Sequence, residues 1–201
     1  MAIPMGDDSQ ALARAIARIR DAIDRGTATG RRNMNAMSLA TVGPSGAPSV
    51  RHVLLKSIDE TGLRFFTDAR SVKARDLAGN PNASVCFYWE PIEEQARVDG
   101  VVERLSDEDV AADFATRPRA GQVMISVSAQ SQPLDSLEAL REAAANADAT
   151  LPDPVPCPSD WIGFRLVPNR IEHWQGSRDR VHTRTVSVLE HGAWRETLLQ
   201  P

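Results

Sequence analysis

The sequence predicts a mainly β fold with peripheral helices, of the α+β class, in which short antiparallel strands close into a barrel. Strand-like runs follow one another from residue 37 onward with turn residues between them, helical crossovers are few, and one long amphipathic helix precedes the strands. Short strands in series are typical of antiparallel barrels, whereas a doubly wound parallel sheet needs a helix after nearly every strand. We expect about seven or eight strands and three or four helices.

The composition of the 201 residues indicates one domain over residues 1–201, since a chain of this length buries roughly 70% of its unfolded surface. A net charge of −4 argues against a nucleic-acid-binding surface. Cys86 and Cys157 stand outside any CxxC or Cys/His pattern, so neither a disulfide framework nor a metal site is predicted. No stretch reaches the roughly 20 apolar residues that span a bilayer, and we expect a cytoplasmic protein without membrane contact.

A helix is predicted over residues 9–25, within a helical segment over residues 1–30. The apolar residues that recur there at spacings of four and three are Leu12, Ile16, Ile19 and Ile23. Ser9 is a candidate N-cap, and Gly26 follows the run. We expect the apolar face to pack on the barrel or at a dimer contact.

From Met37 onward the period changes to that of strands. The strand-like runs cover residues 37–42, 47–59, 63–68, 83–89, 95–105, 161–176, 180–190 and 193–201. His191 and Gly192 are typical of a hairpin turn between the last two runs.

Short helices between the strands are marked by their first residues. Ser71 begins one, which Gly79 ends, and Ser106, with Asp109 three residues later, begins another. The predicted ranges are 71–78 and 106–117, with a further helix over 134–148. The proline-rich loop at residues 151–160 cannot continue a helix and is either an ordered connection or lid, or a simple linker.

Basic and aromatic residues are the candidates for chemistry, because no dinucleotide, phosphate-loop or nucleophile-elbow motif is present. His182 alternates with Arg180 and Arg184 along a predicted strand, so the three side chains would share one face. That face is either a ligand site or a solvated surface. Trp174 either packs over a planar ligand or fills the core.

Three further cations suit an anionic ligand. Lys73 lies in the first turn of the helix that Ser71 begins, where free backbone amides favour a phosphate. Arg51 and Lys56 flank the apolar run HVLL. Each of these cations is equally compatible with an ordinary solvated surface.

Seven segments spread over residues 37–201 carry a resemblance. They are RHVLLK (51–56), LRFFTD (63–68) with SVKARDLAGNP (71–81), the Gln95 of EEQARVDG, TRPR (116–119), SAQSQ (128–132), IEHWQG (171–176) and RVHTR (180–184). Together they resemble the pyridoxamine 5′-phosphate oxidase superfamily. This resemblance implies a split β-barrel that holds flavin mononucleotide (FMN) and works as a homodimer.

The resemblance also implies a set of FMN contacts, drawn from both subunits. They are Arg51, His52, Val53, Leu54, Leu55, Lys56, Phe66, Thr67, Lys73, Gln95, Gln130, Ser131, Trp174 and Arg184. One family position differs, because Val72 stands where an arginine usually precedes the lysine.

Substrate contacts implied by the resemblance are Lys56, Arg117, Arg180 and His182. The vitamin-B6 oxidases surround the substrate phosphate with a lysine, a tyrosine, an arginine and a serine. Lys56 and Arg117 match this pattern, but Asp113 replaces the tyrosine and Gly121 the serine. Since an aspartate repels a phosphate dianion and glycine offers no donor, we expect a non-phosphorylated substrate.

The segment QVMISVSAQSQ, which lacks a GAW-type sequence, and the C-terminal LLQP resemble the phenazine-biosynthesis branch of the superfamily. That branch implies an oxidase that takes a reduced phenazine carboxylate toward aromaticity, with O2 as electron acceptor and H2O2 as product. Arg180 and His182 are then the catalytic candidates, and we expect them to orient the carboxylate, although His182 could also accept a proton. Two alternatives are a pyridoxine/pyridoxamine 5′-phosphate oxidase and a flavin- or haem-binding module without oxidase activity.

Overall fold

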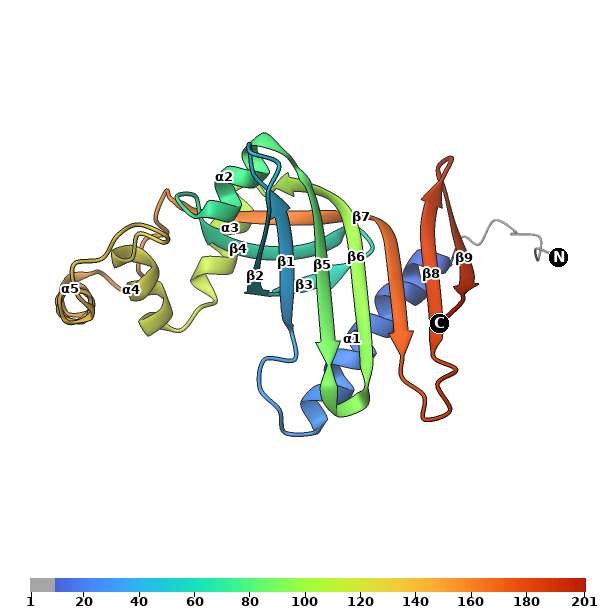
Figure 1. Cartoon of the computed structure of the whole chain (residues 1–201). Coiled ribbons are helices and arrows are strands. Elements are labelled where there is room, and N and C mark those ends of the chain that lie inside the picture. The colour runs from blue at the N-terminus through green and yellow to red at the C-terminus, as the bar shows by residue number, and fades with distance from the viewer. Residues whose placement is uncertain (1–9) are drawn as a thin grey trace.

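A nine-stranded antiparallel sheet forms the body of residues 10–201, the part of the chain that the computed structural model describes (Figure 1). The strands are β1 (Ala36–Val42), β2 (Pro48–Leu54), β3 (Ser57–Asp59), β4 (Gly62–Asp68), β5 (Asn82–Trp89), β6 (Glu94–Arg104), β7 (Trp161–Gln175), β8 (Thr183–Glu190) and β9 (Ala193–Leu199). The helices are α1 (Ala11–Ala28), α2 (Val72–Gly79), α3 (Asp107–Ala115), α4 (Arg119–Val127) and α5 (Leu137–Thr150), with one 3-10 turn, η1 (Glu90–Ile92). The predicted α+β class with peripheral helices is confirmed.

The strand order is β2-β1-β5-β6-β7-β4-β3, and β8 and β9 continue the sheet from the far half of β7. Strand β7 pairs with β6 along most of its length, with β4 over its first residues and with β8 over its last residues. A strand with a different second partner in each half must bend, and the sheet therefore curls into a half-barrel.

The predicted strand over residues 47–59 is wrong as one unit, because the chain changes partner at Leu55 and Lys56. The amide of Leu55 donates to the carbonyl of Asn35, beside β1, whereas the amide of Lys56 donates to the carbonyl of Arg64 in β4. The side chain of Leu55 is buried at this corner. Apolar alternation continues across a change of partner, which explains why we expected fewer strands than the nine found in the described residues.

Helix α1 lies against the inner face of the sheet through Ile16 and Ile19, which join the core formed by strand side chains (Figure 1). The helix continues to Ala28, so the prediction that it stops before Gly26 is wrong. A Cβ at Gly26 would lie 3.0 Å from the sulfur of Met34. This glycine therefore serves close packing within the helix rather than its termination. The candidate N-cap Ser9 lies outside the described residues.

The caps at Ser71 and Ser106 are confirmed. The hydroxyl of Ser71 accepts from the amide of Ala74, and that of Ser106 accepts from the amide of Asp109. Each bond satisfies one of the amides that a helix N-terminus leaves free. His191 and Gly192 both have positive φ, as the predicted hairpin turn requires.

Helices α4 and α5 lie to one side of the sheet (Figure 1). Helix α4 escaped prediction because Pro118 provides no capping side chain and the helix contains β-branched residues. Helix α5 begins at Leu137 after a Ser136 cap, three residues later than predicted. Its C-terminal end is held by Arg119, whose guanidinium donates to the carbonyls of Asp148 and Leu151 at 2.7 and 3.1 Å.

The proline-rich loop at residues 151–160 connects α5 to β7 without regular structure. Arg119 also donates to the carbonyl of Pro152, and Val155 is buried. These contacts support an ordered connection rather than a simple linker. Among the helices of residues 10–201, none combines the length and apolar character needed to span a bilayer.

Gly100 provides a test of the packing at the bend. The register between β6 and β7 shifts at Asp99 and Gly100, and a Cβ at Gly100 would collide with the carbonyl oxygen of Val167. We expect Gly100→Ala to lower the free energy of unfolding by about 2 kcal/mol or more, measured by urea denaturation. The control is Gly79→Ala, where a Cβ meets no atom within 4 Å and where we expect no loss or a gain of under about 1 kcal/mol. Equal effects at the two glycines would contradict this account of the bend.

Candidate functional site

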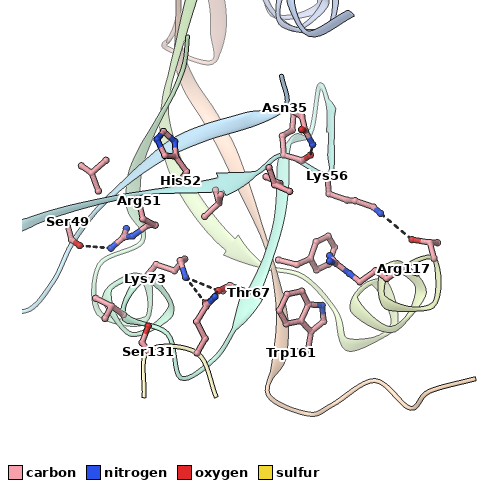
Figure 2. A pocket seen from close by; sticks show the side chains of 18 of the residues that line it. Asn35, Ser49, Arg51, His52, Lys56, Thr67, Lys73, Arg117, Ser131 and Trp161 are labelled. Atoms are coloured by element: carbon pink, nitrogen blue, oxygen red, sulfur yellow. Dashed lines mark hydrogen bonds between the residues drawn. The ribbon is translucent and has the colours of Figure 1, made fainter. Parts of the chain in front are cut away.

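A cavity of about 880 Å³ opens between β2, β4, the first turn of α2 and the segment before α4 (Figure 2). Twelve of the residues predicted to bind cofactor or substrate line it. They are Arg51, His52, Val53, Leu54, Leu55, Lys56, Phe66, Thr67, Lys73, Arg117, Gln130 and Ser131. Residues from four distant parts of the sequence therefore meet at one site.

Lys73 occupies one corner of this cavity, in the first turn of α2 (Figure 2). Its side chain is nearly buried, with 8% of the residue exposed, and its ammonium donates to the hydroxyl of Thr67 at 3.1 Å and to the amide oxygen of Gln130 at 2.8 Å. Both partners are neutral. Within residues 10–201, the charge of Lys73 is thus solvated by dipoles, and no carboxylate is bonded to it.

Arg51 approaches the same corner from β2. Its guanidinium donates to the hydroxyls of Thr41 and Ser49, each at 2.6 Å, and lies 3.6 Å from the carboxylate of Asp76. Asp76 is itself fixed by a 2.7 Å hydrogen bond from Thr41. These contacts hold Arg51 on a rigid strand with its head group at the cavity wall.

The pKa values of both cations reflect this crowding. Burial lowers the pKa of Lys73, and the positive charge of Arg51 lowers it further, against a smaller opposing effect of Asp68. Burial likewise lowers the pKa of Arg51, while Asp76 acts in the opposite direction. Two partly desolvated cations beside a helix N-terminus form a site that an anion with several oxygens, such as a phosphate, would complete. Val72 also lines this corner and contributes no donor.

The opposite end of the cavity contains a different charge arrangement. The guanidinium of Arg117 lies 5.6 Å from the ring centroid of Phe66 and 4.9 Å from that of Trp161. Asp113, whose side chain is 7% exposed, accepts from Arg117 at 2.8 Å and lies 3.2 Å from the ammonium of Lys56. One buried carboxylate thus pairs with Lys56 and Arg117, the two predicted substrate-binding cations that line this cavity. A Cβ at Gly121 would meet nothing within 4 Å, so no side chain fills that position.

A second group of predicted residues lies away from this cavity. Gln95, Trp174 and Arg184 are directly opposite one another on β6, β7 and β8, so they form one row across the sheet. None of the three lines the cavity that contains Lys73. The structure therefore divides the predicted cofactor residues into two sets.

Arg180 and His182 belong with the second set, but not on a strand as predicted. Strand β8 begins only at Thr183, and Arg180 has a φ of 69°, which an extended strand does not allow. The amide of Ser177 donates to Nδ1 of His182 at 3.1 Å, and the ring of His182 lies 5.0 Å from that of Trp174. These residues line a cleft of about 460 Å³ between the end of β7 and the beginning of β8. A compact loop, rather than strand alternation, brings Arg180 and His182 together.

Comparison with known proteins identifies the family. Residues 26–150 match the family model described as pyridoxamine 5′-phosphate oxidase, and residues 161–201 match the pyridoxine 5′-phosphate oxidase C-terminal dimerisation region. The chain belongs to the pyridoxamine 5′-phosphate oxidase family. Membership in this family identifies an oxidoreductase, and the dimerisation region fits a homodimer.

Curated relatives include the pyridoxine/pyridoxamine 5′-phosphate oxidases of Anaeromyxobacter dehalogenans and Myxococcus xanthus. The first is 45% identical, and the alignment covers 92% of this chain and 94% of the relative. The second is 46% identical, and the alignment covers 83% of this chain and 82% of the relative. Among solved structures, PhzG from Burkholderia lata, in complex with tetrahydrophenazine-1-carboxylic acid, is 31% identical with a TM-score of 0.87, covering 92% of each chain. An FMN-binding protein of Nostoc punctiforme shares the fold, with 22% identity, a TM-score of 0.78 and coverage of 92% and 96%.

Two residues of these sites were missed in the sequence. Trp161 forms a wall of the cavity through its contact with Arg117, and only its place directly after the proline-rich loop could have suggested such a role. Glu172 lies two residues before Trp174, and the period of a strand places both on the same face. The available signal for Glu172 was a charged residue on the same strand face as a predicted ligand contact.

Proposed function

We propose that the protein is a homodimeric, FMN-dependent oxidase whose substrate is a reduced phenazine carboxylate without a phosphate group. The single observation that carries the substrate assignment is the pairing of Asp113 with both Lys56 and Arg117. The similarity to PhzG from Burkholderia lata supports the same substrate class.

The cavity residues fit the groups of FMN. Lys73, Arg51 and the first turn of α2 suit its phosphate, because they offer positive charge and donors that no carboxylate occupies fully. Gln130 and Ser131 supply polar groups for the edge of the ring. When bound, FMN would supply the redox chemistry, namely hydride acceptance from the substrate with O2 as the final electron acceptor and H2O2 as the product.

Asp113 disfavours a phosphorylated substrate at the other end of the cavity. A phosphate dianion there would have to displace a buried carboxylate from two cations or lie beside it, and like charges at that distance repel. A planar ring with a single carboxylate can instead lie against the walls formed by Phe66 and Trp161.

The homodimer follows from the separation of the two residue sets. Trp161 at the cavity and Trp174 in the second set occupy opposite ends of β7, about 40 Å apart along the strand at the usual rise per residue. A second copy related by two-fold symmetry can bring Gln95, Trp174 and Arg184 of one subunit to the cavity of the other. The dimerisation region at residues 161–201 includes two of these three positions.

Arg180 and His182 enter the same composite site with Trp174 and are proposed to orient the substrate. The guanidinium of Arg180 suits the carboxylate. Nδ1 of His182 accepts a hydrogen bond from the amide of Ser177. The neutral imidazole therefore carries its proton on Nε2, and this N–H group is a donor for a ligand. This tautomer favours orientation of the substrate over removal of a proton from it.

The second candidate is a pyridoxine/pyridoxamine 5′-phosphate oxidase, which the names of the relatives at 45% and 46% identity support. A direct comparison separates the candidates: protein saturated with FMN is mixed without oxygen with either a reduced phenazine carboxylate or pyridoxine phosphate. We expect rapid bleaching of the flavin by the phenazine substrate. Bleaching by pyridoxine phosphate alone would favour the second candidate, and no bleaching by either would favour a binding module.

Asp113 is expected to control discrimination against phosphate groups. In Asp113→Asn the amide no longer neutralises Lys56 and Arg117, so pyridoxal phosphate should bind about tenfold more tightly as a competitive inhibitor. The matched control is Asp109→Asn, which removes an exposed carboxylate from the same helix outside the cavity. Unchanged or weaker inhibition in Asp113→Asn would refute the proposed role of Asp113.

The lowered pKa of Lys73 predicts that cofactor binding depends on pH. Its lowered pKa means that the ammonium loses its proton at a lower pH than an ordinary lysine, and only the protonated form attracts phosphate. The affinity for FMN should therefore fall as the pH rises through the lowered pKa of Lys73, at a lower pH than an ordinary lysine would require, whereas the affinity for riboflavin, which lacks the phosphate, should change little. Flavin fluorescence titrations measure both constants. Parallel pH profiles for the two flavins would show that Lys73 does not bind the phosphate.

A further inference from the structure

Glu172 is a carboxylate next to the row formed by Gln95, Trp174 and Arg184 of the second set. It lies on β7, only 3% exposed, on the same face as Trp174. One carboxylate oxygen accepts from Nε and Nη2 of Arg184 at 2.9 and 2.7 Å, and the other accepts from Nη2 of Arg170. The nearly buried carboxylate of Glu172 therefore links the side chains of two arginines on this face of the sheet.

The network continues away from Arg184. Nη1 of Arg170 donates to the carboxylate of Asp99 at 3.3 Å, and Asp99 accepts from Ser84 at 2.7 Å. Within residues 10–201, Asp99 thus contacts Arg170 and Arg97 but not Arg184. Of the two acidic residues of the network, Glu172 holds the predicted flavin contact Arg184, whereas Asp99 contacts Arg170.

Glu172 fixes the orientation of Arg184. The guanidinium has five N–H groups, of which Glu172 takes the one on Nε and one on Nη2, and the carbonyl of Gln200 takes one on Nη1 at 3.0 Å. Among the contacts made by residues 10–201, one N–H group on Nη1 and one on Nη2 remain without an acceptor. Trp174 is directly opposite Arg184 on the neighbouring strand, so the two side chains extend from the same face of the sheet.

The protonation state of Glu172 agrees with this arrangement. Burial alone would raise the pKa of its carboxyl, but hydrogen bonds and charges from Arg170 and Arg184 outweigh burial and hold the pKa below its usual range. The carboxylate is therefore ionised at neutral pH. Buried ion pairs add little net stability compared with apolar residues of similar size, so stability alone is a weak reason for placing a charge here.

We propose that Glu172 is a positioning residue for the flavin, which holds Arg184 in the one orientation that directs its two free N–H groups at the ring of the bound flavin. This inference rests on the proposed function, because it takes Arg184 as a flavin contact. Fixing a long side chain before binding removes the entropy cost of ordering it in the complex. Loss of Glu172 should therefore weaken binding of the flavin ring itself.

The test is flavin binding by Glu172→Gln, with Asp99→Asn as the matched control. Glu172→Gln should weaken the affinity for both FMN and riboflavin by about 10- to 100-fold and shift the visible spectrum of the bound flavin, because the contact is to the ring and not the phosphate. Asp99→Asn, which removes a charge from the same network without touching Arg184, should change both affinities by less than about twofold. The double variant Glu172→Gln with Arg184→Lys should bind no more weakly than Arg184→Lys alone.

A purely structural role predicts a different result, namely a lower melting temperature for Glu172→Gln with flavin affinity and spectrum unchanged, and this would overturn the inference. If Glu172→Gln does not fold, Glu172→Asp, with a shorter reach to Arg184, should show the same loss to a smaller degree, and normal affinity there would also overturn it. Failure of the flavin assignment on which the inference rests is recognised separately, because the wild-type protein would then bind neither FMN nor riboflavin, whatever residue stands at 172.

Discussion

The pairing of β7 is the constraint on which the rest of the structure depends. Its fifteen residues pair with β6 along most of the strand, and on the other edge with β4 at the beginning and with β8 at the end, so a single strand joins both halves of the curled sheet. Trp161 at its first residue forms a wall of the large cavity, and Trp174 near its last residue belongs to the second set. Because one strand fixes both ends, the two halves of the proposed site keep a constant spacing within each subunit.

The positions of the carboxylates determine which cations have donors available to a ligand. Lys73 has only neutral partners, and Arg51 lies 3.6 Å from its nearest acid, so their corner keeps excess positive charge. Lys56 and Arg117 share Asp113, so this carboxylate occupies donors of both cations and leaves one net positive charge at that end. The two ends of the cavity thus differ in how far a carboxylate already occupies the cations, and we propose that the first end takes the phosphate of the cofactor and the second takes the substrate.

Local signals predicted much of the fold. Serine caps marked α2 and α3, and positive φ at His191 and Gly192 matched the hairpin turn. The sequence could not reveal the change of partner at Leu55, which depends on distant strands, or the loop at Arg180, whose conformation depends on bonds such as that between Ser177 and His182. The site residues came from a family resemblance, and their division into two distant sets is visible only when the strands are arranged in space.

The central claim, that each flavin site is built from two copies of the chain, is tested most directly by mixing two defective variants. Lys73→Met damages the cavity and Arg184→Ala the second set, so each homodimer should bind little FMN. When the two variants are unfolded and refolded together in equal amounts, half of the dimers are mixed, and each mixed dimer rebuilds one intact site from its undamaged halves. We expect about one quarter of the wild-type FMN to be retained after gel filtration. Retention no greater than that of the separate variants would contradict the composite site.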